Sequence, residues 1–460
     1  MNTETTICAI ASAPGTGAIA IVRLSGSDAI GICDKLFCSK TEGKKLSEQK
    51  ANTIHFGSIV DGKDVVDEVL VSIFKSPNSY TGEDLVEVSC HGSVYIQQKL
   101  LQLFIKHGAS MASPGEFTQR AFLNRKMDLS QAEAVADLIA SSGEAAHRLA
   151  INQMRGGISD EIKSLRAQLV DFISLVELEL DFSEEDVEFA DRNKLRELMD
   201  EIKTLLDNLL NSFELGNVIK NGVPVAIIGE TNVGKSTLLN VLLKEDKAIV
   251  SEIPGTTRDV IEDQINIKGV SFRFIDTAGI RESSDTIEAM GIERTFKKIS
   301  QAKIILQIVD ATNKIEQTRK SVNKIENQIN DNQEHIVLVN KTDKKKINIS
   351  DYKFDTIPVL AISAKFNKNI DKLEESLISI INYKRPEEKD TILSNTRHFE
   401  AISRANESLG RAITGLDTGL PGDLMAQDIR EAIHYLGEIT GEITTNEILG
   451  NIFEKFCVGK

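Results

Sequence analysis

The chain reads Gly229-Glu230-Thr231-Asn232-Val233-Gly234-Lys235-Ser236 near its middle, which is the pattern of a phosphate-binding loop. The apolar run Val225–Ile228 precedes it and predicts a buried strand, and Thr237 and the residues after it predict the start of a helix. Backbone N–H groups of such a loop, and of the helix that follows it, bind phosphate oxygens. We therefore expect Lys235 to contact the β- and γ-phosphates and Ser236 to ligate Mg²⁺.

Two further segments complete the predicted phosphate site. Asp276-Thr277-Ala278-Gly279 follows the predicted strand Phe272–Ile275. Its carboxylate is expected in the outer shell of the metal, and the Gly279 N–H at the γ-phosphate. Between this motif and the phosphate loop, residues 251–259 are expected to form the switch region. Thr257 in that region is predicted to complete the Mg²⁺ shell through its hydroxyl.

The base is predicted from two later motifs. Asn340-Lys341-Thr342-Asp343 follows the apolar strand Ile336–Val339. A carboxylate at Asp343 accepts two parallel hydrogen bonds from guanine N1–H and N2–H₂, and adenine offers neither arrangement. Ser363-Ala364-Lys365, after the strand Val359–Ile362, is expected to close the base pocket. Motifs at the carboxyl ends of successive strands indicate a ligand site at one edge of a parallel sheet. The sequence therefore predicts a GTP site.

The residues expected to contact GTP come from these five segments. They are Asn232, Val233, Gly234, Lys235, Ser236, Thr237, Ser251, Glu252, Ile253, Pro254, Gly255, Thr256, Thr257, Asp276, Thr277, Ala278, Gly279, Asn340, Lys341, Asp343, Ser363, Ala364 and Lys365.

Hydrolysis needs a group that orients water. Ile280 follows Asp276-Thr277-Ala278-Gly279, at the position where small Ras-like GTPases carry a glutamine. An apolar side chain cannot position a nucleophile, so another residue or ion must supply that function. Glu288 is the nearest downstream candidate for a catalytic residue, with simple surface exposure as the alternative.

Composition limits the possible partners. The 460 residues include 41% apolar and 27% charged residues and no tryptophan, and no apolar run is long enough to span a bilayer. The N-terminal residues lack the pattern of a signal peptide, and five cysteines without metal-ligand spacing favour a reducing cytoplasm. A formal charge of −15 argues against broad nucleic-acid binding. Any RNA contact must be local or supplied partly by a partner, and Lys344-Lys345-Lys346 is expected to be a solvated loop rather than an RNA-binding patch.

Three kinds of secondary-structure pattern along the chain predict a multidomain protein. Mixed strand and helix patterns, including the strand Ala18–Val22 and the helix Ile96–Ile105, predict an α+β domain over 1–122. Residues 123–216 are predicted to be helical, 217–384 to form an α/β P-loop (Ras-like) G domain, and 385–460 to be helical again. Helical stretches on both sides of the α/β domain suggest that it is inserted into one discontinuous α-helical domain.

The helical parts carry two finer signals. Ser130-Gln131-Ala132-Glu133 has the spacing of a capping box at a helix start. Apolar stripes with helical spacing predict the core of a bundle. Their members are Leu165, Leu169, Phe172, Val176 and Leu180, then Ile202, Leu205, Leu206, Leu209 and Phe213, and finally Ile429, Ile433 and Leu436.

The chain resembles the MnmE (TrmE) family, the bacterial GTPases of tRNA wobble-uridine modification. The resemblance covers essentially the whole length. Its motifs are Ala13-Pro14-Gly15-Thr16-Gly17, Asn78-Ser79-Tyr80-Thr81-Gly82-Glu83-Asp84, Pro114-Gly115-Glu116-Phe117-Thr118 and the terminal Phe456-Cys457-Val458-Gly459-Lys460. The family implies a folate-binding N-terminal domain that forms a homodimer, a discontinuous helical domain and an inserted G domain. It also implies a flavoprotein partner, MnmG, in a heterotetramer that modifies carbon 5 of uridine 34 with a tetrahydrofolate such as 5-formyltetrahydrofolate as one-carbon source.

Residue roles carry over from the family by position. Asn232 matches the family's K⁺ ligand, and Ser251, Ile253 and Thr256 are implied to complete the K⁺ site. Glu288 aligns with the family's catalytic glutamate. The folate positions match at Arg23, Glu87, Lys126 and Lys460. The tail departs from the usual Cys-Ile-Gly-Lys by carrying Val458, which preserves the apolar character.

Two alternatives belong to other classes. A ribosome-assembly GTPase could have a similar G domain, but it would need a basic RNA-binding module that the acidic chain does not present. A GTP-dependent scaffold would use its helical domain only for assembly. Deletion of the last four residues separates these readings, because a scaffold should tolerate it and a modification enzyme should lose its product.

Overall fold

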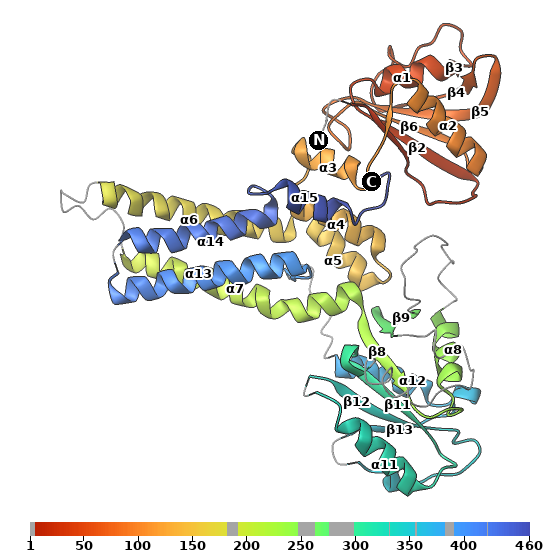
Figure 1. Cartoon of the computed structure of the whole chain (residues 1–460), viewed down its shortest axis with the longest axis vertical. Helices are drawn as coiled ribbons and strands as arrows, with labels where there is room; N and C mark the ends of the chain where they lie inside the picture. Colours follow the sequence, from red (N-terminus) through yellow and green to blue (C-terminus); the bar gives the residue numbers. More distant parts are fainter. Residues whose placement is uncertain are drawn as a thin grey trace.

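The computed structural model describes residues 5–181, 192–246, 263–275, 299–330, 332–354, 357–381, 391–420 and 422–460. Figure 1 shows two sheet-containing parts and a long helical bundle between them. The predicted fold class, an α+β N-terminal domain, a discontinuous helical domain and an inserted α/β domain, is confirmed. Among the described helices, none is both long and apolar enough to cross a membrane.

The N-terminal part is a seven-stranded sheet in the order β3-β4-β5-β6-β2-β1-β7, with helices packed against it. The strands are β1 Ile7–Ile10, β2 Ile19–Ser25, β3 Phe37–Ser39, β4 Thr53–Asp61, β5 Asp64–Phe74, β6 Leu85–His91 and β7 Ser110–Met111; the helices are α1 Ala29–Leu36, α2 Val94–Lys106 and α3 Glu116–Leu123. Alternation of buried and exposed residues along β2 and β6 gives each strand one core face. The antiparallel register pairs Arg23 with Glu87, so both side chains lie on the same face of the sheet.

The bundle is built from two segments that lie far apart in the sequence. The first supplies α4 Leu129–Ala140, α5 Glu144–Met154, α6 Gly157–Asp181 and α7 Arg192–Asn221, and the second supplies α13 Thr396–Thr418, α14 Gly422–Thr440 and α15 Asn446–Phe453. Most members of the predicted stripes lie in one shared core or pack against it. The prediction that Leu205 belongs to the core is wrong, since 38% of this residue is exposed. The side chain of Leu180 lies outside the described part of the chain.

The inserted part is a six-stranded sheet in the order β13-β12-β11-β8-β10-β9. Its strands are β8 Val223–Ile228, β9 Asp263–Ile267, β10 Val270–Phe274, β11 Ile304–Asp310, β12 Glu334–Asn340 and β13 Val359–Ala361. Its helices are α8 Lys235–Asp246, α11 Ile315–Glu326 and α12 Ile370–Ile380, with short turns η1 Ile349–Tyr352 and η2 Ala364–Phe366. All neighbouring strands are parallel except β9, which pairs antiparallel with β10. This arrangement brings the carboxyl ends of β8, β11, β12 and β13 to one edge.

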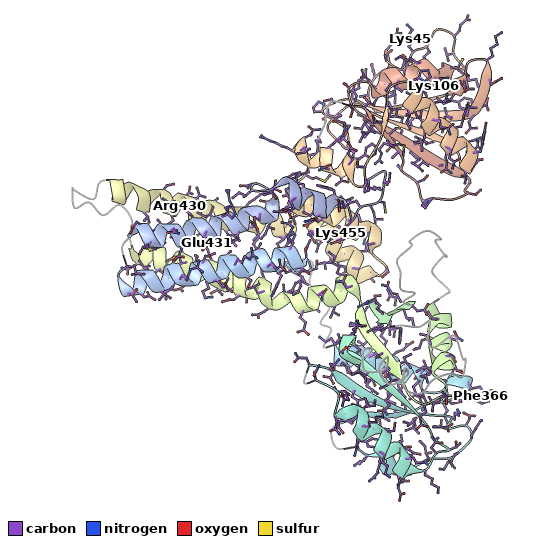
Figure 2. The ribbon with its side chains drawn as sticks, viewed as in Figure 1. Lys45, Lys106, Phe366, Arg430, Glu431 and Lys455 are labelled. Atoms are coloured by element: carbon purple, nitrogen blue, oxygen red, sulfur yellow. The ribbon has the colours of Figure 1, made fainter. Side chains whose placement is uncertain are left out.

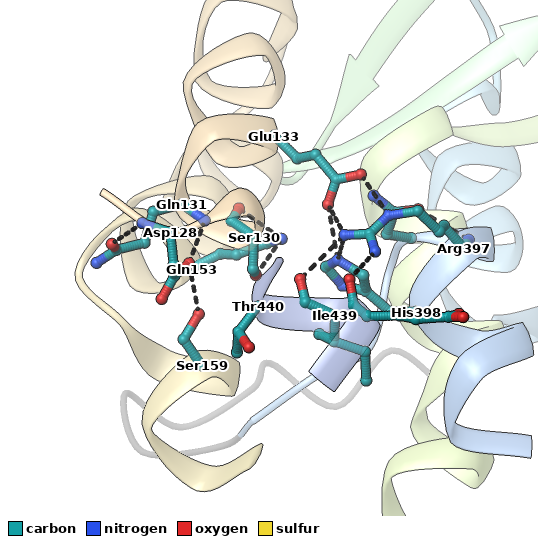
Figure 3. Close-up of polar contacts among 12 residues, drawn as sticks. Asp128, Ser130, Gln131, Glu133, Gln153, Ser159, Arg397, His398, Ile439 and Thr440 are labelled. Carbon is teal, nitrogen blue, oxygen red and sulfur yellow. Dashed lines mark hydrogen bonds and ion pairs between the residues drawn. The ribbon is translucent and has the colours of Figure 1, made fainter. Parts of the chain in front are cut away.

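The start of α4 differs from the sequence prediction. Asp128 is the N-cap, and Asp128 and Gln131 form the reciprocal capping box. Ser130 is therefore not a cap; it lies buried inside the helix and accepts a hydrogen bond from Gln153. Glu133 is released from a capping role and points to the second helical segment (Figure 3). Both patterns fit the local spacing, and the tertiary partners decide between them.

Glu133 joins the two halves of the bundle. Its carboxylate accepts hydrogen bonds from Arg397 Nε at 2.9 Å and Nη2 at 2.8 Å, and lies 2.7 Å from His398 Nε2 (Figure 3). Arg397 also donates to the Glu438 carbonyl at the end of α14. Burial alone would raise the pKa of Glu133, but His398 and Arg397 outweigh burial and lower it. The carboxylate therefore stays ionised in the core of the joint.

We expect Glu133→Gln to destabilise the bundle by about 3–5 kcal/mol, because it leaves the Arg397 guanidinium without its buried counter-charge. Glu442→Gln is the matched control: it removes the partner of Arg166 in a pair whose carboxylate is 41% exposed, and it should cost less than about 1 kcal/mol. Urea unfolding followed by circular dichroism measures both. Equal unfolding midpoints for the two variants would contradict this role of Glu133.

Candidate nucleotide site and a second site at the tail

The phosphate loop runs from the end of β8 into α8 through backbone conformations that favour glycine. Gly229 has φ +148°, Asn232 +61° and Gly234 +105°. A Cβ atom on Gly229 would lie 2.4 Å from the Ile308 carbonyl oxygen, and one on Gly234 would lie 2.3 Å from Asn340 Nδ2. The loop therefore passes too close to β11 and to the end of β12 for any side chain at either glycine.

Within the loop, the side chains separate into two groups. Asn232, Ser236 and Thr237 are exposed, whereas Val233 is buried in the core. Val233 can therefore meet a nucleotide only through its backbone. Lys235 Nζ donates to the carbonyl oxygens of Gly229 at 2.7 Å and Glu230 at 2.6 Å. These bonds hold the ammonium group across the mouth of the loop, where a phosphate would compete for it.

Asn340 ties the base-binding segments to the phosphate loop. Its Nδ2 donates to the Val233 carbonyl at 2.8 Å, and its Oδ1 accepts from the Ala364 N–H at 3.0 Å. Lys341 has φ +64°, and its Nζ donates to the Asn232 carbonyl at 2.6 Å. Asn340, at the end of β12, therefore links the phosphate loop at Val233 to the base-binding segment at Ala364.

Sequence reasoning missed Asp310, which ends β11. Its carboxylate pairs with Lys341 Nζ at 2.6 Å and accepts from the N–H and hydroxyl of Thr312. Burial would raise the pKa of Asp310, but the bonds from Lys341 and Thr312 prevail and lower it. An aspartate directly after the segment Ile304–Val309, which is apolar except for Gln307, was the available signal, because it repeats the position of the other motifs at the sheet edge.

Asp343 is exposed and held by one neighbour. Ser363 Oγ, on a buried residue, donates to Asp343 Oδ1 at 2.6 Å, and this bond lowers the pKa of the Asp343 carboxyl. Lys365 is exposed and lies 5.4 Å from the centre of the Phe366 ring. An ionised, oriented carboxylate beside an open surface suits the donor pair of guanine.

Several predicted site residues lie outside the described part of the chain. They are Ser251, Glu252, Ile253, Pro254, Gly255, Thr256, Thr257, Asp276, Thr277, Ala278, Gly279 and Glu288. The described part therefore brings together the phosphate loop and the base-binding segments. The phosphate loop includes Asn232 and Ser236, the first ligands expected for K⁺ and Mg²⁺.

A second constellation forms where the tail of the chain returns to the N-terminal sheet. Arg23 Nη2 lies 2.7 Å from Glu87 Oε1, and Arg23 Nη1 donates to the Gly459 carbonyl at 3.2 Å. The guanidinium also lies 5.6 Å from the ring centres of Tyr80 and Phe117. Two rings, an ion pair and a backbone carbonyl thus converge from both ends of the chain.

The tail is held by backbone contacts. Val458 forms an isolated antiparallel bridge with Pro114, and a Cβ atom on Gly459 would lie 2.2 Å from the Ile10 carbonyl oxygen. Burial and the nearby Arg23 lower the pKa of Lys460, against the influence of Glu87 and Cys457. Lys126 contacts a different segment, since its Nζ donates to the Pro77 carbonyl at 2.9 Å. The structure therefore pairs Arg23 with Glu87, brings Lys460 within electrostatic range of both, and leaves Lys126 at the neighbouring loop.

Comparison with known proteins agrees with this architecture. A family model described as the MnmE helical domain matches residues 129–457, and one described as the GTP-binding protein TrmE N-terminus matches residues 6–126. The chain is 56% identical to the tRNA modification GTPase MnmE of Bacteroides fragilis and 55% identical to that of Bacteroides thetaiotaomicron, over 100% of both chains in each case. The G domain of the T. maritima FeoB iron transporter is 25% identical over 35% of this chain and 98% of its own, with a TM-score of 0.27.

Gly234→Ala should abolish high-affinity GTP binding, because its Cβ would displace the Asn340 side chain from both of its hydrogen bonds. Gly269→Ala is the matched control: Gly269 also has a positive φ, +89°, but nothing lies within 4 Å of a Cβ there. Both variants should lose about 1–2 kcal/mol of stability through backbone strain. Only Gly234→Ala should lose GTP affinity in a fluorescent-nucleotide titration, and equal affinity of the two would refute the role of the contact.

Asp343→Asn should weaken GTP binding by at least about tenfold, or 1.4 kcal/mol, and should improve binding of xanthosine triphosphate. The amide can donate to the carbonyl that replaces the guanine amino group. Asp371→Asn, at an exposed position in the first turn of α12, controls for loss of a surface charge. Competition titrations with the two nucleotides measure the switch. An unchanged preference for GTP in Asp343→Asn would show that another group reads the base.

Proposed function

The chain belongs to the MnmE family of tRNA modification GTPases, and on that premise we propose that it works with a flavoprotein partner, MnmG, on the wobble uridine (U34) of certain tRNAs. The protein is a GTP hydrolase. The reaction installs an aminomethyl or carboxymethylaminomethyl group at carbon 5, and a tetrahydrofolate such as 5-formyltetrahydrofolate supplies the one-carbon unit. The observation that carries the proposal is the meeting of Arg23, Glu87 and the tail at one place.

The residues at the tail fit a folate. The Glu87 carboxylate suits the N–H donors of a pterin edge, and the Arg23 and Lys460 cations suit a polar ring edge or the glutamate carboxylates. The Tyr80 and Phe117 rings beside Arg23 supply aromatic surface at the same place. Burial lowers the pKa of Lys460 because it disfavours the charged ammonium group. An anionic ligand beside it would offset that cost. Lys126 completes the proposed folate set from the adjacent loop.

A homodimer is proposed through the N-terminal domain. Phe56 on β4 and Leu70 on β5 are cross-strand partners on one face of the sheet, and Ile54 shares that face. These side chains are 50%, 47% and 66% exposed, respectively. Adjacent exposed apolar side chains on a sheet are a common feature of protein interfaces, which supports a second copy of the chain there. Together with MnmG, such a dimer would form a heterotetramer.

The remaining parts of the proposal follow the family. We propose domain limits of 1–122, 123–216, 217–384 and 385–460, of which the first falls within α3 and the second within the last turns of α7. A cytoplasmic location is supported by five free cysteines. Mg²⁺ would be held by Ser236 and Thr257, and K⁺ by Asn232, Ser251, Ile253 and Thr256. Oxygen ligands of this kind suit both hard cations. A ribosome-assembly GTPase is less consistent with relatives that match the chain over its full length.

The proposed function is tested by mass spectrometry of U34 from cells that lack the native gene and carry the parent chain or a variant. The parent should restore the modified uridine. Arg23→Gln should hydrolyse GTP normally but lose the modification and bind 5-formyltetrahydrofolate at least tenfold more weakly by calorimetry. Lys99→Gln, which breaks the pair of Lys99 on α2 with Asp61 in the same N-terminal part, should behave as the parent. Failure of the parent to restore modified U34 would overturn the proposal.

GTP hydrolysis should depend on K⁺ and on pairing of two G domains. Ile280 cannot orient water, and arginine fingers contribute roughly 10³–10⁵ in kcat elsewhere, so a cation in that place should act on a comparable scale. Turnover is measured against protein concentration in KCl and in NaCl at matched ionic strength. Glu288→Ala should bind GTP normally and barely turn over. Equal turnover in the two salts would remove the K⁺ mechanism and leave the GTP site intact.

A further inference from the structure

One face of the inserted domain is basic, although the chain as a whole is acidic. Helix α11 with its N-cap Lys314 and the segment 344–354 together carry eight basic and three acidic side chains, although the whole chain has a net charge of −15. The basic residues are Lys314, Arg319, Lys320, Lys324, Lys344, Lys345, Lys346 and Lys353, and all eight are exposed. We call the surface formed by these residues the α11 face.

The two halves of the α11 face are fixed relative to each other. Val322 from α11 packs in one apolar cluster with Tyr352, and Ile315 and Ile347 pack against that cluster. Arg319 Nη2 donates to the Asp351 carbonyl at 3.4 Å, which adds a polar link. The apolar sides of both segments therefore face the sheet, and their charged sides form a common outer surface. In the sequence they are two separate runs, one ending at Glu326 and the other beginning at Lys344, and Lys344-Lys345-Lys346 considered alone favours a solvated loop over an RNA-binding patch.

A cavity of about 520 Å³ opens where the two halves of the α11 face meet. Three lysines line it, Lys314, Lys345 and Lys346, together with the amide side chains of Asn313 and Asn348. Two acidic side chains, Glu316 and Asp351, also line it. Lysine ammonium groups and amide N–H groups around a concave surface match the donors that bind phosphate oxygens.

We infer that the α11 face is a docking surface for the phosphate backbone of the tRNA substrate, an inference that rests on the proposed function. Charge complementarity supports this occupant, because an acidic chain can hold a polyanion only where basic residues are concentrated. In Figure 1, α11 lies on the side of the inserted domain away from the bundle, so the surface is open in the single chain. The contacts would position the tRNA without reading its sequence.

Docking on this domain would also place RNA next to the nucleotide site. Lys344 follows Asp343 directly, and Lys314 precedes α11 four residues after Asp310, the partner of Lys341. RNA bound at the α11 face would therefore lie beside the loops that hold the guanine-binding segments. Any coupling between the two sites would be reciprocal, so that GTP and tRNA would change each other's affinity by the same factor.

The test is tRNA binding by the full chain at several salt concentrations. A fluorescent tRNA transcript with unmodified U34 is titrated with the parent and with the triple variant Lys314→Glu, Lys345→Glu and Lys346→Glu, between about 50 and 200 mM KCl. At about 100 mM KCl, the triple variant should bind at least roughly tenfold more weakly. The slope of log affinity against log salt should become shallower by about 2 to 3, since each lysine on a phosphate contributes about one.

The matched control reverses three exposed lysines of the N-terminal part, Lys35, Lys45 and Lys106, two of which are labelled in Figure 2. It has the same net charge as the triple variant and should bind tRNA as the parent does within about twofold. Both variants should keep the parent's GTP turnover without tRNA and its thermal midpoint, because none of the six lysines is in the nucleotide site.

Three results would overturn the inference. The triple variant could keep the parent's affinity and salt slope, the control could lose as much affinity as the triple variant, or the parent could bind anionic vesicles of phosphatidylserine more tightly than tRNA. The first two leave the proposed function standing, provided that the parent restores modified U34 in cells. Loss of modified U34 with the parent chain would instead count against the proposed function itself.

Discussion

The buried ion pair of Glu133 and Arg397 joins the two halves of the bundle, which lie before and after the inserted domain in the sequence. Its two partners are 264 residues apart, and everything between them includes α5, α6, α7 and the whole nucleotide-binding sheet. Lys220 at the end of α7 pairs with Asp137 on the same helix as Glu133, at 2.7 Å. The last turn of α7 is thereby tied to the joint, and β8 begins at Val223 directly after it. The phosphate loop is thus connected to the bundle core through one strand and one helix.

Close backbone packing supports the same joint. A Cβ atom on Gly216 of α7 would lie 2.0 Å from the Leu393 carbonyl oxygen, and the Leu393 N–H donates to Ser212 Oγ at 3.0 Å. The chain entering the inserted domain therefore lies against the chain leaving it. A second contact is made by Gly143, before α5, where a Cβ atom would lie 2.6 Å from Asn266 Nδ2 at the end of β9. The Asn266 side chain therefore touches the backbone just before α5, and this contact links β9 to the bundle.

The two ends of the chain meet by a comparable device. Gly459 has φ +99° and approaches the Ile10 carbonyl too closely for a side chain. This approach brings the Gly459 carbonyl to Arg23, which is already paired across the sheet with Glu87. The tail and the N-terminal sheet therefore share one polar centre, although Arg23 and Gly459 are 436 residues apart.

Local sequence determined the features that depend on nearest neighbours. The glycines of the phosphate loop, the apolar runs before each motif and the helical stripes specify strands, helices and the carboxyl-end position of the nucleotide residues, because periodicity and glycine conformations act over a few residues. The same local rules failed at Ser130 and Leu205, where capping and burial depend on which element packs alongside. Tertiary structure alone decided that Asp128 caps α4, that Glu133 serves Arg397, that Asp310 holds Lys341, and that α11 and 344–354 share one basic face. The last three join segments that are not neighbours in the sequence, and at the cap itself the distant Ser159 and Lys163 donate to the Asp128 carboxylate. The physical reason is that burial and charge are properties of the packed neighbourhood rather than of the chain segment.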